Sequence, residues 1–448
     1  MITKEQELNL AREDYSLLTD LYQLTMMACY VGEDLATKPA SFELFTRRLP
    51  ENYGYLIAMG LTQALDYLQN LRFTPQQIAS LQETGIFNHA PEQFWSLLES
   101  GRFTGDVWAV PEGTAVFAHE PLLRIEAPLW QAQLVETYLL NTINYQTLIA
   151  TKAARLRYVA GEEAQLLEFG TRRAFSPQGA MWAARAAIAG GLDATSNVLA
   201  ALKLGRKPAG TMAHALVMAI GAMVGGEDEA FSAFSRYFPQ APLLIDTYDT
   251  VAAASRLAEG VKAGKRSLTG IRLDSGDLVT LSQKVRSLLP EVTIFASGDL
   301  DEWKIAQLKE AGACIDGYGL GTKLVTGAPV NGVYKLVEID GIPTSKKSLN
   351  KATYPGKKQI FREQEPGKFI KDRLALADEM PEEGEEPLLR LVMQGGECCD
   401  GGDSLETIRE RTTNSVASLP RATVQISEPD PFYVKISEQL QGLTNKTC

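Results

Sequence analysis

The chain has 448 residues, of which 45% are hydrophobic and 22% charged, a composition typical of a globular protein. This length suffices for a large buried core divided over two or three domains. Its 55 acidic residues outnumber its 44 Lys and Arg residues, so the formal net charge is −11. An acidic surface disfavours nucleic acid and anionic membranes as partners, and a bound phosphate would have to be held by local groups.

Cysteine and histidine are sparse. The five cysteines form no C-x-x-C pair and offer no zinc-binding spacing with the three histidines; they are Cys29, Cys314, Cys398, Cys399 and Cys448. The odd number of cysteines and the charged start MITKEQELNLARED favour the cytoplasm over secretion. Residues 209–226 lack Asp, Glu, Lys and Arg, but Gly, Thr and His interrupt them. We therefore expect a buried strand leading into a helix there, and no membrane span.

The first 130 residues or so read as helices followed by short strands. Helical periodicity marks residues 16–31, 55–71 and 91–100, and residues 107–128 alternate as strands do.

The middle of the chain repeats one pattern seven times. Short apolar runs end in Gly, Asp, Ser or Thr, and amphipathic helical segments such as 177–191, 250–264, 277–290 and 300–312 lie between them. The runs are centred near Phe169, Ala194, Met212, Ile245, Leu273, Phe295 and Tyr318. Seven βα units predict a barrel, with an open doubly wound sheet as the alternative. Both arrangements place ligands at the carboxyl ends of the strands.

From about Val333 the chain alternates short strands with charged connections, including the acidic loop at 378–386. The expected fold is therefore α/β: an irregular βα barrel at 136–332, beside a second layer domain built from residues 1–135 and 333–448.

Polar residues gather where three consecutive predicted strands end. RLDSGDL carries Arg272, Asp274, Ser275 and Asp277, ASGD carries Ser297, Gly298 and Asp299, and GYGLGTK carries Gly319, Gly321, Thr322 and Lys323. Each motif alone is more often a helix cap or a tight turn. Three of them on neighbouring barrel units predict one site for a phosphorylated sugar.

Two further groups follow predicted strands. Arg172 and Arg173 either form surface salt bridges or clamp an anion with their planar forks. His214 is either a satisfied core histidine or a nucleophile or base at the same rim. His89 and His119 receive no role.

Several motifs together resemble nicotinate phosphoribosyltransferase. They are LLTDLYQLTMMACY, FELFTRRLPENYGYLIAMGL, LLNTINYQTLIATKAARL, EFGTRRAFSPQGAMWAARAAIAGGLDATSNVLA, GTMAHALVMA, LLIDTYDT, GIRLDSGDL, ASGDLDEWKI, IDGYGLGTKLVTG and VYKLVEIDG with PGKKQIFR. They run in order from about Leu17 to Arg362. Residues 372–448 match no pattern of this family, so no role is carried onto them.

The resemblance implies a type II phosphoribosyltransferase fold and an ATP-assisted reaction of nicotinate with phosphoribosyl pyrophosphate (PRPP), with Mg²⁺ as cofactor and ATP hydrolysed through a phosphohistidine. The products would be nicotinate mononucleotide and pyrophosphate, in NAD biosynthesis. It also implies a homodimer with shared sites, in which Tyr22 of the partner subunit stacks on the pyridine ring.

The resemblance assigns roles to residues of the matched motifs. His214 would be phosphorylated, and Arg272 and Asp274 would face the ribose. The substrate-binding set comprises Phe169 and Arg172 (nicotinate and PRPP), Gly298, Asp299, Gly321 and Thr322 (5′-phosphate), and Asp193, Ser196, Thr211 and Ser275. No protein ligand is assigned to a metal.

This chemistry needs no strong base, because the pyridine nitrogen is already a nucleophile and the sugar becomes cation-like as pyrophosphate leaves.

Three alternatives stay open. Nicotinamide phosphoribosyltransferase shares the phosphate site, and Asp193 near Ser196 leaves the choice of ring substituent open. A phosphate-binding barrel isomerase or aldolase would need a base partner for Lys323. A non-enzymatic scaffold would not need polar residues at nearly every strand end.

Overall fold

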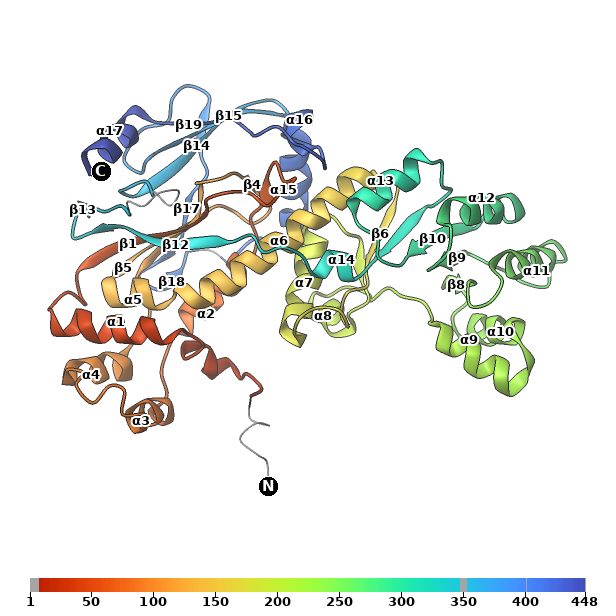
Figure 1. Ribbon diagram of the computed structural model, residues 1–448, viewed down its shortest axis with the longest axis horizontal. Coiled ribbons are helices and arrows are strands. Elements are labelled where there is room, and N and C mark those ends of the chain that lie inside the picture. Colours follow the sequence, from red (N-terminus) through yellow and green to blue (C-terminus); the bar gives the residue numbers. More distant parts are fainter. Residues whose placement is uncertain (1–7, 347–352, 400, 448) are drawn as a thin grey trace. The chain divides into compact units, whose positions relative to one another are not determined.

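The computed structural model describes residues 8–346, 353–399 and 401–447, so Cys448 and the first seven residues of the charged start lie outside the described residues. The chain forms two compact units (Figure 1): unit 1 comprises residues 1–148 and 329–448, and unit 2 comprises residues 149–328. The expected boundaries were 135/136 and 332/333. The first one differs because α6 (Glu136–Ala160) is one continuous helix, so no turn marks the passage from one unit to the next.

Unit 1 is built around a seven-stranded antiparallel sheet with the order β13-β12-β1-β5-β3-β17-β18. Its strands are β1 (Pro39–Thr46), β3 (Asp106–Ala109), β5 (Pro121–Pro128), β12 (Gly332–Ile339), β13 (Ile342–Pro343), β17 (Arg390–Gln394) and β18 (Glu397–Cys398). β1 pairs with β12, placing Leu44 opposite Tyr334. Segments from both ends of the chain are thus adjacent strands, which confirms the expected layer domain.

Two smaller sheets complete the strands of unit 1. β16 (Glu385–Pro387), β14 (Lys358–Glu365), β15 (Lys368–Leu376) and β19 (Val434–Ile436) form one, and β2 (Leu56–Ile57) pairs with β4 (Ala115–Val116) in the other.

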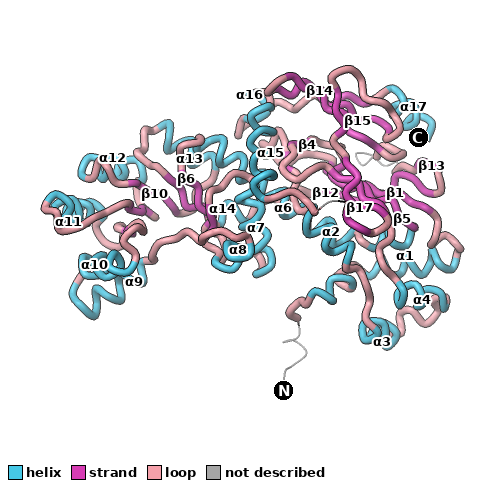
Figure 2. Tube along the Cα trace, turned by 180° about the vertical axis from the view of Figure 1, so that it is seen from behind, coloured by secondary structure: helices cyan, strands magenta, loops and turns pink. Residues whose placement is uncertain are grey.

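Helices α1 (Leu21–Gly32), α3 (Pro75–Glu83) and α4 (Glu92–Ser100) lie together on one side of the large sheet (Figure 2). With α5 (Leu129–Leu134) they enclose an apolar core that includes Met27, Phe94 and Trp130. The helix predicted at 55–71 is wrong over its first six residues and its last two. α2 begins at Leu61 and ends at Gln69, because β2 precedes it and Gly60 takes a left-handed φ of 104°. The remaining helices of unit 1 are α15 (Leu405–Ser418), α16 (Arg421–Val424) and α17 (Glu438–Thr447).

Unit 2 contains a parallel sheet with the order β7-β6-β11-β10-β9-β8. Its strands are β6 (Gln165–Glu168), β7 (Ala194–Thr195), β8 (Leu243–Leu244), β9 (Gly270–Leu273), β10 (Thr293–Ser297) and β11 (Gly317–Leu320). The last strand pairs with the first, as a barrel requires. The helices are α7 (Pro177–Ala189), α8 (Val198–Lys203), α9 (His214–Ile220), α10 (Glu227–Tyr237), α11 (Thr250–Lys262), α12 (Leu278–Leu288), α13 (Glu302–Glu310) and α14 (Thr322–Val325).

The strand predicted near Met212 is wrong, because residues 206–213 are irregular. One backbone bond, from Ala209 N to Thr195 O at 2.9 Å, ties this segment to β7. Pro208 has no N–H to extend a ladder. The barrel is therefore open between β7 and β8, and this opening makes it irregular.

None of the helices in the described ranges is both long and apolar enough to cross a membrane. The uncharged stretch at 209–226 forms the irregular segment, α9 and a π-helical turn at Gly221–Gly225.

Candidate active site

The carboxyl ends of parallel strands meet at one edge of a sheet, and in unit 2 this edge collects most of the predicted residues. Loops after the strands carry Phe169 and Arg172 (β6), Ser196 (β7), Asp274 and Ser275 (β9), Gly298 and Asp299 (β10), and Gly321 and Thr322 (β11). His214 is the first residue of α9, in the connection between β7 and β8.

The loops after β8 and β9 are held together by one carboxylate. Asp246, two residues beyond β8, accepts bonds at Oδ2 from the backbone N of Asp274 (2.7 Å) and from the hydroxyl of Ser275 (2.8 Å). Its side chain is 2% exposed. Asp246 Oδ1, by contrast, has no hydrogen-bond partner among the described residues.

His214 faces this free oxygen. Its Nε2 lies 3.9 Å from Asp246 Oδ1, and its Nδ1 lies 3.0 Å from the Thr247 hydroxyl. The side chain is 38% exposed, so His214 is not a satisfied core residue. Asp249, the second aspartate of the LLIDTYDT motif, instead caps α11 by accepting a bond from Ala252 N at 2.9 Å. The structure thus favours Asp246.

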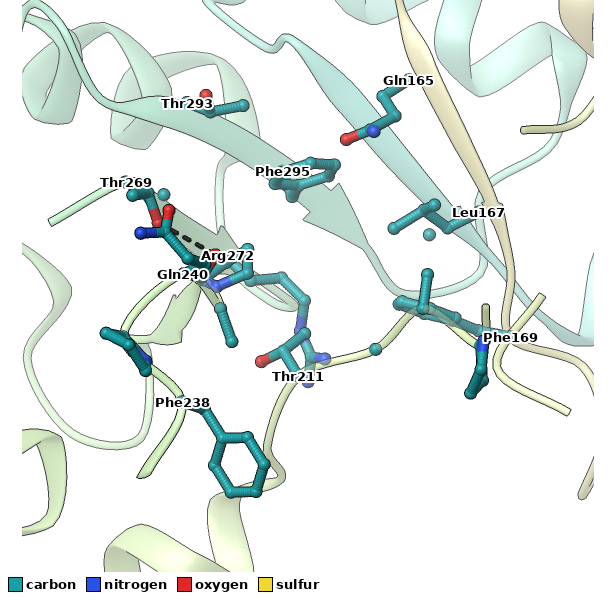
Figure 3. Close-up of a pocket in the computed structure, with 18 of the residues that line it drawn as sticks. Gln165, Leu167, Phe169, Thr211, Phe238, Gln240, Thr269, Arg272, Thr293 and Phe295 are labelled. Atoms are coloured by element: carbon teal, nitrogen blue, oxygen red, sulfur yellow. Dashed lines mark hydrogen bonds between the residues drawn. The ribbon is translucent and has the colours of Figure 1, made fainter. Parts of the chain in front are cut away.

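A cavity of about 590 Å³ occupies the interior of the barrel (Figure 3). Barrel interiors are normally filled by large side chains, but Gly270, Thr293 and Gly319 line this one. Phe169, Phe238, Phe295 and Thr211 also face it. Its volume falls in the range of small-molecule sites.

Arg272 extends into this cavity toward Thr211, and its buried Nε has no partner among the described residues (Figure 3). Burial lowers the pKa of the Arg272 guanidinium, and the charges of Asp274 and Asp246 act in the opposite sense. The group remains a cation near neutral pH. It therefore offers an unsatisfied donor to an anionic or hydroxyl-bearing ligand.

Glycines allow close approach at two places on this edge. At Gly298, with φ 96°, a Cβ would lie 2.3 Å from the carbonyl oxygen of Asp274. At Gly319 a Cβ would lie 2.6 Å from the ring of Phe169. Asp299 follows Gly298 with a left-handed φ of 49°.

Arg172 and Arg173 are exposed, and neither forms an ion pair with any residue in the described part of the chain. Arg172 donates one weak bond, from Nη1 to Phe169 O at 3.4 Å. This argues against the surface salt-bridge alternative and leaves the fork free for an anion.

Asp193 is not part of this cluster. It precedes β7, at the amino end of the strands, where its Oδ2 accepts bonds from Arg157 Nη2 (2.7 Å) and Leu166 N (2.8 Å). Tyr22 lies on α1 in unit 1 and is 45% exposed. Burial, and after it the charge of Glu136, raises the pKa of Tyr22 to about 12.

Sequence reasoning passed over Glu168, which is 1% exposed at the end of β6. Its carboxylate accepts bonds from the backbone N of Gly170 and from the Thr195 hydroxyl (2.5 Å). It thereby ties the loops after β6 and β7. Burial raises the pKa of Glu168, and these two bonds oppose the effect. The sequence pattern that could have pointed to Glu168 is an acidic residue at the end of an otherwise apolar strand.

The open barrel, its hollow interior and the polar edge define an α/β barrel enzyme with a site for a small anionic ligand. Matches to family models identify the enzyme family to which the chain belongs. Residues 17–144 match the nicotinate phosphoribosyltransferase N-terminal domain, residues 164–365 the nicotinate phosphoribosyltransferase family, and residues 385–444 the nicotinate phosphoribosyltransferase C-terminal domain. The last match corrects the expectation that residues 372–448 follow no family pattern.

Similar proteins agree with this match. The chain is 39% identical over 439 residues to nicotinate phosphoribosyltransferase pncB2 of Mycobacterium tuberculosis, covering 95% of this chain and 92% of that protein. It is 39% identical over 468 residues to nicotinate phosphoribosyltransferase of Bacillus subtilis, covering 95% and 94%. The crystal structure of human nicotinic acid phosphoribosyltransferase superimposes with a TM-score of 0.83 at 31% identity, covering 96% and 100%. The chain belongs to the nicotinate phosphoribosyltransferase family.

Proposed function

We propose that the protein joins nicotinate to PRPP, forming nicotinate mononucleotide and pyrophosphate in NAD biosynthesis, and that ATP hydrolysis assists the reaction. The observation that carries the proposal is the grouping of His214, Asp246 and Asp274 at one strand edge, beside a cavity entered by Arg272. A phosphoryl acceptor 3.9 Å from Asp246, which in turn is bonded to the loop that carries the ribose-binding carboxylate, suits a reaction that uses both ATP and PRPP.

The barrel edge would divide the substrates among its loops. Arg272 and Asp274 would bind the ribose, with Ser275 beside them. Phe169 and Arg172 would hold nicotinate by ring contact and by its carboxylate, with Ser196 and Thr211 nearby. The tight turns at Gly298–Asp299 and Gly321–Thr322 would receive the 5′-phosphate through backbone N–H groups.

As the bond to pyrophosphate breaks, positive charge grows on the sugar and negative charge on the leaving group. A carboxylate at Asp274 stabilises the first charge. Mg²⁺ would neutralise the second, and Asp274 Oδ2 suits it because that oxygen accepts no hydrogen bond from the described residues. Nicotinate needs only orientation, since its ring nitrogen is already the nucleophile.

For the ATP step, a neutral His214 nitrogen would attack the terminal phosphorus of ATP. A nitrogen to phosphorus bond forms as the bond to the departing ADP oxygen breaks. The negative charge of Asp246, whose Oδ1 lies 3.9 Å from Nε2, would favour a proton on Nε2 and so leave Nδ1 as the attacking nitrogen. Nδ1 would exchange its hydrogen bond with the Thr247 hydroxyl, 3.0 Å away, for the bond to phosphorus.

We also propose a cytoplasmic homodimer with shared sites, in which Tyr22 of the partner subunit covers the pyridine ring. Support comes from unit 2, where apolar side chains of α8 are more than half exposed: Val198, Leu199 and Leu202. Such a patch beside Ser196 is typical of a subunit interface.

The test is product analysis by chromatography after the protein is mixed with Mg²⁺, PRPP and either nicotinate or nicotinamide, with and without ATP. We expect nicotinate mononucleotide and pyrophosphate, with more product when ATP is present. Product from nicotinamide alone would favour the nicotinamide enzyme. No nucleotide from either ring would contradict the proposal.

A further inference from the structure

Ser297 is the last residue of β10, and its side chain lies in the interior of unit 2 at 4% exposure. Its hydroxyl donates a hydrogen bond to Asp274 Oδ1 at 2.6 Å. The sheet register explains the meeting: Ala296 lies opposite Leu273 in the parallel pair of β9 and β10, so the next residues of both strands emerge side by side. The bond therefore joins two neighbouring strand ends.

The backbone of Asp274 is already held from both sides. Asp246 accepts its N–H at 2.7 Å, and Gly298 packs so closely on its carbonyl that no Cβ would fit. Its carboxylate is held differently. Within the described ranges, Ser297 alone donates a hydrogen bond to it.

A carboxylate held at one oxygen has a defined orientation, whereas the terminal torsion of a free aspartate is broad. The orientation of the Asp274 carboxylate is important because Arg272 lies close to it in the chain. Residues 272 and 274 lie on the same face of an extended chain, two positions apart, and the charge of Asp274 acts on the guanidinium. Arg272 Nε has no hydrogen-bond partner among the residues that the structure describes. A freely turning carboxylate would pair with this guanidinium, and both groups would then be lost to the ligand.

We infer that Ser297 is a positioning residue for the reaction: it fixes Asp274 Oδ1 so that Oδ2 faces the ribose and pyrophosphate of PRPP and Arg272 stays free. The inference rests on the proposed function. It adds a residue that touches no substrate and acts through Asp274.

A purely structural role for Ser297 is the competing explanation, and Ser282 is a matched control for it. Ser282 lies on α12 in the same unit and is fully buried. Its hydroxyl donates to Val279 O on the same helix at 3.1 Å and accepts from Cys314 N, ahead of β11, at 3.0 Å, so neither bond involves a strand-end loop. Ser282→Ala removes the same atoms from a buried site without touching Asp274.

The experiment compares Ser297→Ala, Ser297→Thr, Ser282→Ala, Asp274→Asn and the double variant Ser297→Ala/Asp274→Asn by steady-state kinetics and thermal melting. We expect Ser297→Ala to lower kcat/KM for PRPP by about 10- to 100-fold, as loss of an orienting partner does, while the KM for nicotinate changes by less than about twofold. Ser297→Thr, which keeps the hydroxyl, should retain most activity. Ser282→Ala should lower the melting temperature and leave kcat/KM for PRPP unchanged.

The double variant Ser297→Ala/Asp274→Asn shows whether Ser297 acts through Asp274 or independently of it. If Ser297 acts through Asp274, its removal costs little more once Asp274 is already Asn. Additive losses would overturn the inference, as would equal kinetic losses in Ser297→Ala and Ser282→Ala, or a well-folded Ser297→Thr as impaired as Ser297→Ala.

Calorimetric titration of Mg²⁺ and PRPP into wild type and Ser297→Ala separates this inference from the proposed function. A wild type that binds PRPP but forms no nucleotide contradicts the proposed function alone. Equal PRPP affinity in both proteins contradicts the role of Ser297 alone.

Discussion

Two polar atoms at the barrel edge are buried without a partner in the described chain, Arg272 Nε and Asp246 Oδ1. A buried polar atom left unpaired costs about 1–3 kcal/mol, so such atoms are rare. Here each lies beside a group assigned to the reaction. We interpret both atoms as groups whose missing hydrogen-bond partner is supplied by a substrate or by the phosphorylated histidine.

The first prediction at the residue scale concerns His214. His214→Asn should abolish ATP hydrolysis that depends on nicotinate, because the nucleophilic nitrogen is lost, yet leave slow nucleotide formation without ATP. The measurement is acid-labile protein label from γ-labelled ATP, beside product formation with and without ATP. Labelling of His214→Asn at the wild-type level would place the phosphate on another residue.

The second concerns the free fork of Arg172. Arg172→Lys keeps the charge but loses the planar pair of donors, so we expect a loss of about 2–4 kcal/mol in transition-state binding. It is measured as the drop in kcat/KM. Arg173→Lys, one position along the same loop, is the comparison. Near-native turnover in Arg172→Lys would show that the fork is not used.

At the scale of secondary structure, aspartates play two distinct parts around unit 2. Asp249, Asp277 and Asp301 accept bonds from the first turns of α11, α12 and α13. Asp246 and Asp274 lie three residues before a capping aspartate and face the site. The motifs DTYD and DSGD therefore each contain both the helix cap that the pattern usually signals and an aspartate that faces the site.

This division predicts opposite outcomes for two aspartates three residues apart. Asp249→Ala should destabilise the fold by about 0.5–2 kcal/mol through loss of a helix cap and leave phosphorylation of His214 intact. Asp246→Asn should suppress phosphorylation. Urea unfolding and the labelling assay distinguish the two. Loss of labelling in Asp249→Ala at full stability would reverse the assignment.

At the scale of the whole molecule, unit 1 buries two neighbouring acids, Glu120 and Asp372, which make the free energy of unfolding depend on pH. Arg362 forms two bonds with the carboxylate of Asp372, from Nε at 2.8 Å and Nη2 at 2.6 Å. Glu120 is fully buried beside them. Burial, and after it the charge of Asp372, raises the pKa of Glu120 well above its usual range, and Arg362 acts in the opposite sense. Glu120 therefore binds its proton more tightly in the folded chain than in the unfolded chain.

An acid whose pKa is raised in the folded state releases its proton on unfolding only at pH values between its unfolded and its folded pKa. The free energy of unfolding therefore falls as pH rises from the ordinary Glu value through the folded pKa, by up to about 1.4 kcal/mol per pH unit. Glu120→Gln, which is neutral at every pH, should flatten this slope. Urea unfolding at three pH values between 5.5 and 8.5 measures it, with Glu363→Gln as a control at a partly exposed pair with Lys371. Parallel curves for wild type and Glu120→Gln would contradict the prediction.

The expected dimer can be tested by subunit exchange. Tyr22→Ala and Asp274→Ala should each be inactive alone. If the partner's Tyr22 completes each site, some mixed dimers regain an intact site and recover up to about a quarter of wild-type activity under random exchange. No recovery after demonstrated exchange would indicate that Tyr22 acts within its own chain or has no role.

The amino-acid sequence alone predicted the βα pattern of unit 2, the layer built from both chain ends, and most of the polar edge. These features depend on local periodicity, on turn residues and on the rule that parallel strands end together. Three other points became visible only in the folded chain. Asp193 pairs with Arg157 at the opposite strand end, the segment near Met212 leaves the barrel open, and Asp246, not Asp249, lies beside His214. Each of these depends on which atoms from distant segments come within bonding distance, and neither spacing nor composition encodes such long-range packing.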